Sequence, residues 1–149
     1  MSLALYDGTP YVFYEDDINS YKATVMKYIS GTNTWESVGP IGFSDGQPAS
    51  LSLTIYNGTP YVAYQDGGNS WKATVMKYIS GTNTWEPVGT PGFSAGQGIT
   101  PSLVIYNNTP YIAYQDGGND NKATVMQFND TTTEGTSIYQ WYRDGIAIS

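Results

Sequence analysis

The chain contains no cysteine and no histidine. The absence of cysteine excludes disulfide bonds and thiolate metal sites. The absence of histidine removes the side chain that most often acts as an acid–base group near neutral pH and as an imidazole metal ligand. Any catalysis or metal binding must therefore use carboxylates, amides and hydroxyls.

Basic residues and long apolar runs are also scarce. Six Lys and Arg face 13 Asp and Glu, for a net charge of -7, which excludes a phosphate-binding surface for nucleic acid. No apolar run approaches the roughly 20 residues that cross a bilayer, so no membrane partner is expected. Met1 leads almost at once into a repeat, so no secretory signal is predicted and the compartment stays open.

What the sequence does contain is a repeat with a shift of fifty residues. Residues 59–68, Thr-Pro-Tyr-Val-Ala-Tyr-Gln-Asp-Gly-Gly, return at 109–118 and more loosely at 9–18, and residues 22–36 and 72–86 are identical. A period of this length is typical of solenoids, propellers and related arrays.

Each unit reads as four short strands separated by Gly- and Asn-rich turns. In the second unit these are residues 52–56, 61–65, 72–78 and 84–88, and the Pro in the fourth is tolerable in an edge strand. Four antiparallel strands per unit, with longer loops at 39–49 and 89–100, predict all-β propeller blades at about 2–50, 51–100 and 101–149. An open β-sandwich is the alternative, but a sandwich has no reason to repeat at fifty.

The repeat resembles a known family. The stretch Tyr-Ile-Ser-Gly-Thr-Asn-Thr-Trp-Glu at 28–36 and 78–86 is similar to the Tyr and Trp-Glu spacing of kelch repeats, and Asn57-Gly58 stands where a kelch blade has its turn. The kelch double glycine is absent, since Ala63-Tyr64 stands there. The resemblance implies rings of six or seven blades that mostly bind proteins, with some relatives that are enzymes or sugar-binding modules.

The end of the chain departs from the repeat. Residues 129–133 read as a polar linker, and Tyr-Gln-Trp-Tyr-Arg-Asp-Gly at 139–145 resembles immunoglobulin-like modules of large bacterial surface proteins. So short a segment cannot form such a module, so the resemblance implies ancestry, and that ancestry is extracellular. We expect the tail, residues 129–149, to supply the outer strand of the third blade or to pair with a second copy.

Three blades are too few for a ring, because single-chain propellers use about 4 to 8. We therefore expect a homodimer that closes a six-bladed ring, since an open arc would leave two apolar faces in water. Phe13, which replaces Ala63 and Ala113 of the other units, is expected at the dimer junction with Tyr139 and Trp141. Neutral drift in the first repeat is the alternative for Phe13.

The candidate ligand-binding residues lie in the turns between second and third strands. They are Asp16, Asp17, Asn19, Tyr21, Asp66, Asn69, Trp71, Asp116, Asn119 and Asp120. Such a carboxylate-rich rim has the oxygen ligands that Ca²⁺ takes, but Asp-Gly-Gly-Asn is also a good turn, and the turn is the favoured interpretation. Tyr21 and Trp71 would either stack on sugars or pack against a neighbouring blade.

Three functions remain open from the sequence. The first is a non-catalytic propeller scaffold that binds a protein or glycan through repeated loops, with no cofactor and no catalytic residue. The second is a carbohydrate-active hydrolase that uses the acidic cluster of Glu15, Asp16 and Asp17. The third is a truncated or mobile gene product with no settled ligand. Sialidase chemistry is excluded, because one Arg cannot form an arginine triad.

Overall fold

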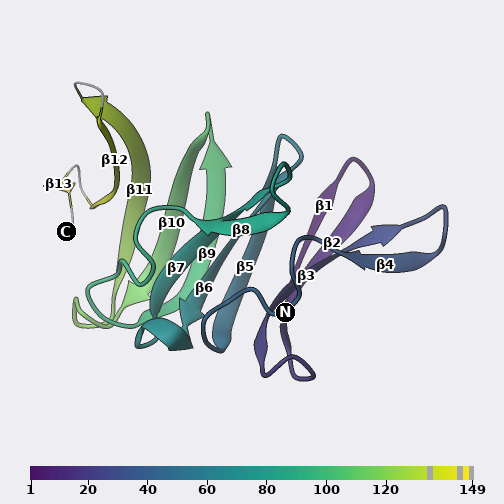
Figure 1. Ribbon diagram of the computed structural model, residues 1–149. Helices are drawn as coiled ribbons and strands as arrows, with labels where there is room; N and C mark the ends of the chain where they lie inside the picture. Colours follow the sequence, from purple (N-terminus) through teal and green to yellow (C-terminus); the bar gives the residue numbers. More distant parts are fainter. Residues whose placement is uncertain (134–135, 144–145, 148–149) are drawn as a thin grey trace.

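The structure, a computed structural model, describes residues 1–133, 136–143 and 146–147, with side chains described as far as Asn129. It consists of three antiparallel sheets, one per repeat, which follow one another along an arc (Figure 1). No helix in the described part of the chain is long and apolar enough to cross a membrane.

Each sheet is a meander in which neighbours in the sequence are neighbours in the sheet. The first contains β1 (Ser2–Tyr6), β2 (Thr9–Asp16), β3 (Lys22–Ile29) and β4 (Thr34–Ser37). The second contains β5 (Pro48–Tyr56), β6 (Thr59–Asp66), β7 (Lys72–Ile79) and β8 (Thr84–Pro87), with a short 3₁₀ turn, η1 (Gly67–Asn69). The third contains β9 (Gly98–Tyr106), β10 (Thr109–Asp116), β11 (Lys122–Thr133), β12 (Thr136–Arg143) and β13 (Ile146–Ala147). The sheets are β-propeller blades, as the repeat predicts.

The turns that join the first two strands of each sheet have the predicted chemistry. Asn57 and Gly58 have φ of 49° and 76°, and Asn107 and Asn108 have φ of 46° and 62°. Positive φ at both central residues is the geometry of the type I′ hairpin turn, which matches the twist of the flanking strands. Asn and Gly adopt this geometry at little cost, so these residues fix the strand register that follows.

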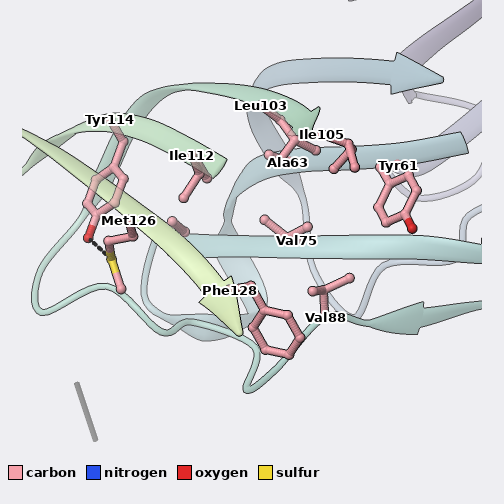
Figure 2. Packing of buried hydrophobic residues seen from close by; sticks show 11 residues of the cluster. Tyr61, Ala63, Val75, Val88, Leu103, Ile105, Ile112, Tyr114, Met126 and Phe128 are labelled. Carbon is pink, nitrogen blue, oxygen red and sulfur yellow. Dashed lines mark hydrogen bonds between the residues drawn. The ribbon is translucent and has the colours of Figure 1, made fainter. Parts of the chain in front are cut away.

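The core lies between the sheets, in two clusters. One cluster joins the first and second sheets and includes Phe13, Val25, Val62 and Tyr64. The other joins the second and third sheets (Figure 2), where Tyr114 donates a hydrogen bond to Met126 Sδ at 2.9 Å. Every inner sheet face is therefore covered by the next sheet, and burial between sheets supplies the main stabilisation.

Hydrogen bonds repeat across the seams between sheets. Leu53 N–H donates to Ser2 Oγ at 3.0 Å, and Leu103 N–H donates to Ser52 Oγ at 3.1 Å. At the first seam, Trp85 Nε1 donates to the carbonyl of Val38 at 2.8 Å. A seam is thus a specific surface with a fixed register as well as an apolar contact.

Two expectations drawn from the sequence need correction. Phe13 is fully buried against the second sheet, where its ring meets Tyr64 edge-on at 6.1 Å, so it cannot lie on a free junction face. The Phe13 ring fills space between the first and second sheets of the same chain. Residues 129–133 are also no linker: they continue β11, because this stretch pairs with β12 in a hairpin that ends at Thr133 and Thr136.

The atypical tail takes the place of an outer strand. β12 pairs antiparallel with β11, as β4 pairs with β3 and β8 with β7, and β13 adds two residues beyond it. The side chains of Tyr139 and Trp141 lie outside the described residues, so their predicted place at a dimer junction stays a prediction.

Candidate functional site

The second strand of each sheet ends at a buried aspartate, which begins the turn to the third strand. These residues are Asp16, Asp66 and Asp116. In the second sheet, Asp66 is buried, and its Oδ1 accepts a hydrogen bond from Gly68 N–H at 3.0 Å. Its Oδ2 accepts from Asn69 Nδ2 at 2.9 Å and from Thr74 Oγ1 at 2.8 Å. Buried polar groups must be paired in this way. The geometry of Asp66 is that of a carboxylate that organises its own turn.

The first sheet repeats this arrangement. Asp16 Oδ2 accepts from Asn19 Nδ2 at 2.8 Å and from Thr24 Oγ1 at 3.2 Å. The hydrogen bond from Asn19 is the main cause that holds the pKa of Asp16 below its ordinary value, and the one from Thr24 adds to it. A general acid needs the opposite shift, since it must carry its proton near neutral pH. Asp16 is therefore held in its ionised form.

The third sheet keeps the buried Asp116, whose Oδ1 accepts from Gly118 N–H at 2.9 Å. Asp120 lies at the surface, where it pairs with Lys122 at 3.5 Å. Asp17 is likewise exposed and accepts from Ile18 N–H at 2.9 Å, and Asn119 is half-buried. Within the described residues, no three His, Cys, Asp or Glu side chains come together in a group that could hold a metal ion. The acids of the three turns therefore form no such cluster in the described part of the chain.

The two aromatic candidates stand at the same turn in their sheets. Tyr21 and Trp71 are both partly exposed and have positive φ, 58° and 62°. The Trp71 ring lies against its own turn, because a Cβ added at Gly67 would come within 3.3 Å of it. The position needs a left-handed backbone, which Asn121 adopts in the third sheet with φ of 57°. Trp71 thus contacts its own turn, and the same left-handed backbone recurs at this position in all three sheets.

A hollow lies elsewhere, at the seam between the second and third sheets. This seam pocket has a volume of about 1010 Å³. Its second-sheet wall comes from β6, β7, β8 and the segment after β8. Its third-sheet wall comes from the β9–β10 turn, the start of β10 and β11. The residues that carry its chemistry are Tyr61, Lys77, Glu86, Asn107, Asn108, Thr109, Phe128 and Asn129.

The base of the seam pocket is apolar and its rim is polar. Tyr61 and Phe128 are buried, and Lys77 Nζ lies 5.8 Å from the centre of the Tyr61 ring. A cation over a tyrosine ring is attracted to its negative face, which holds the ammonium in the pocket. Glu86 is the cross-strand partner of Lys77, so one donor and one acceptor stand side by side on this wall.

The seam between the first and second sheets has the same pocket in a reduced form, with a volume of about 180 Å³. Its lining is related by the fifty-residue shift: Tyr11 and Lys27 stand for Tyr61 and Lys77, and Gly58 stands for Asn108. Tyr78 at this seam packs beside Trp85, with ring centres 5.6 Å apart. The chain thus carries this site twice, as a pocket of about 180 Å³ at the first seam and as a pocket of about 1010 Å³ at the second.

The sequence interpretation missed the seam pocket. It placed the candidate ligand-binding residues in the turns between second and third strands, and none of those residues lines this pocket. The signal that points to the pocket is a charged side chain inside a strand that recurs as Lys27 and Lys77. Such a lysine on a face that is otherwise buried requires a space for its ammonium group.

Comparison with known proteins supports the fold. No family model matches the chain, and no curated protein matches it. A solved structure of a fucose lectin from Kordia zhangzhouensis, in complex with methyl-fucoside, has a TM-score of 0.56 at 12% identity and covers 98% of each chain. A family 117 glycoside hydrolase, Zg3597, from Zobellia galactanivorans has a TM-score of 0.50 at 14% identity. The match takes in 85% of this chain but only 49% of the hydrolase. At these identities the likeness establishes a shared propeller fold.

Proposed function

We propose that the chain is a non-catalytic propeller module that binds a glycan in the seam pocket. The observation that carries this proposal is the composition of the rim, where Lys77, Glu86, Asn107, Asn108 and Asn129 surround an aromatic base. Amides donate and accept, ammonium donates and carboxylate accepts, which together match the many hydroxyls of a sugar. A pocket of about 1010 Å³ accommodates a short oligosaccharide.

Two further points support binding over hydrolysis. The buried acids at the turns are used as hydrogen-bond acceptors, and the lowered pKa of Asp16 makes it a poor proton donor. The fucose lectin has the same fold over the same length, which makes methyl-fucoside the natural first probe. Release of sugar by the wild-type chain would favour the acidic-rim hydrolase and contradict the proposal.

We also propose that the repeat is kelch-like. The Tyr and Trp of its motif are cross-strand partners, Tyr28 with Trp35 and Tyr78 with Trp85, and their ring centres lie 5.5 Å and 5.6 Å apart. The spacing of the motif therefore has a structural reason, since the intervening turn brings the two rings together across the outer strand pair.

The test is a calorimetric titration with methyl-fucoside, followed by a glycan array. Lys77→Met removes the ammonium and keeps most of the length of the side chain. A charged hydrogen bond contributes about 1.5–3 kcal/mol, so we expect at least tenfold weaker binding. Lys27→Met is the matched control at the small pocket and should change binding less than twofold. Equal effects of the two variants, or no glycan bound at millimolar concentration, would contradict the proposal.

A second variant separates the rim from the fold. Asn108→Gly places in the third sheet the residue that the second sheet has at Gly58, at a backbone φ of 62° that glycine adopts freely. It removes one amide from the pocket and leaves the backbone N–H that donates to Tyr56 Oη at 3.3 Å. We expect weaker glycan binding with unchanged unfolding.

A further inference from the structure

The first sheet has an outer face that the repeat normally buries. This leading face corresponds, by the fifty-residue shift, to the faces with which the second and third sheets contact the sheet before them. Leu3 is 67% exposed, whereas Leu53 and Leu103 are 8% and 7% exposed. Trp35 is 46% exposed, whereas Trp85, in an identical local sequence, is 8% exposed. The leading face therefore carries core residues in solvent.

The third sheet has the complementary uncovered face at the other end of the arc (Figure 1). This trailing face corresponds to the faces with which the first and second sheets contact the sheet after them. Val125 is 59% exposed, whereas Val25 and Val75 are 0% and 1% exposed. Ala113 and Ala123 are exposed as well, although Ala63 and Ala73 are fully buried.

These two faces are the two halves of a seam that the chain already forms twice. The seam includes a hydrogen bond from the leucine N–H of a leading face to the serine Oγ of a trailing face, at 3.0 Å and 3.1 Å. Leu3 supplies that N–H on the first sheet, and Ser102 supplies that hydroxyl on the third. The apolar character of the strands and the hydrogen-bonding groups of the seam are therefore already matched between the two ends.

We infer that the trailing face of one copy packs on the leading face of a second copy, and that two such junctions close a ring of six sheets. The occupant is a second copy of this chain, because its opposite end repeats the surface that covers these residues inside the arc. A head-to-tail contact of this kind closes only at a fixed number of copies, and two copies give a blade number within the usual range. The inference concerns assembly and does not depend on the glycan pocket.

The test is sedimentation velocity and equilibrium on the full chain. We expect a dimer at micromolar concentration. Leu3→Glu and Val125→Glu, one on each face, should each weaken association at least 100-fold, because each alters both junctions. Ile18→Glu is the control: it introduces the same charge at a residue that is 90% exposed in a turn outside both faces, and it should leave the dimer intact.

Mixing the two junction variants gives a sharper result. A pair of one Leu3→Glu copy and one Val125→Glu copy has one junction made of two unaltered faces, so the mixture should recover dimers that neither variant forms alone. A monomeric wild type at tens of micromolar, a wild-type polymer larger than a dimer, or a Val125→Glu variant that still dimerises would each overturn the inference. Circular dichroism of each variant confirms that the sheets remain folded.

Discussion

Trp35 and Trp85 form a natural pair of probes, because residues 22–36 and 72–86 are identical in sequence but differ in environment. Trp85 is buried, stacks on Phe43 with ring centres 4.6 Å apart and donates a hydrogen bond to Val38. Trp35 lies on the leading face, where Tyr28 is its neighbour in the same sheet. The strand propensity of the surrounding sequence is therefore the same at both positions, and it cancels when the effects of substituting the two tryptophans are compared.

We expect Trp85→Ala to lower the free energy of unfolding by about 3–5 kcal/mol, since it removes a buried aromatic side chain and leaves a cavity. About 1 kcal/mol of this comes from the hydrogen bond to Val38. Trp35→Ala should cost about 1 kcal/mol in the isolated chain, because its ring is already half in water.

Urea unfolding in a Val125→Glu background measures both costs, because this background keeps the leading face uncovered. The extrapolated free energies and the slopes are compared at one protein concentration. Equal costs for the two tryptophans, within about 1 kcal/mol, would refute the assignment of one to a seam and the other to a free face.

Three further outcomes are expected. Gly39→Ala should lower the free energy of unfolding by about 2 kcal/mol or more, because φ is +76° and the new Cβ would lie 2.9 Å from the seam tryptophan. Gly81→Ala, where a Cβ meets nothing within 4 Å, is its control in thermal unfolding. Thr74→Val should cost about 2 kcal/mol in urea unfolding because it breaks the hydrogen bond to Asp66, and Thr74→Ser should restore most of it. The lowered pKa of Asp16 contributes stability that is present above the ordinary carboxyl pKa of 3.8 and is lost as the pH falls through the folded-state value. Unfolding of Asp16→Asn should therefore depend less on pH than wild type between about pH 5 and pH 2; an unchanged slope would contradict this.

The repeat made the blade architecture predictable, since strand lengths, Asn-Gly turns and the fifty-residue shift are local or periodic signals. The continuation of β11 through residues 129–133 was missed, because a threonine-rich polar stretch reads as a loop unless the pairing with β12 is known.

The candidate site was less predictable, because it depends on which sheets meet. Phe13 was placed at a junction from its size alone, although its face is decided by its register opposite Val25. Tyr61 and Asn108 line the seam pocket from two different sheets. The periodicity of side chains within one strand does not show that residues of two sheets lie close together. Only the packing of sheets reveals it.

The repeated hydrogen bond from a leucine N–H to a serine Oγ has a consequence for how such chains gain repeats. Because each unit carries both halves of its contact, duplication of fifty residues adds a unit whose two sides already fit its neighbours. Unequal recombination at this period therefore produces foldable proteins without compensating substitutions, and the identity of residues 22–36 and 72–86 is the trace such an event leaves.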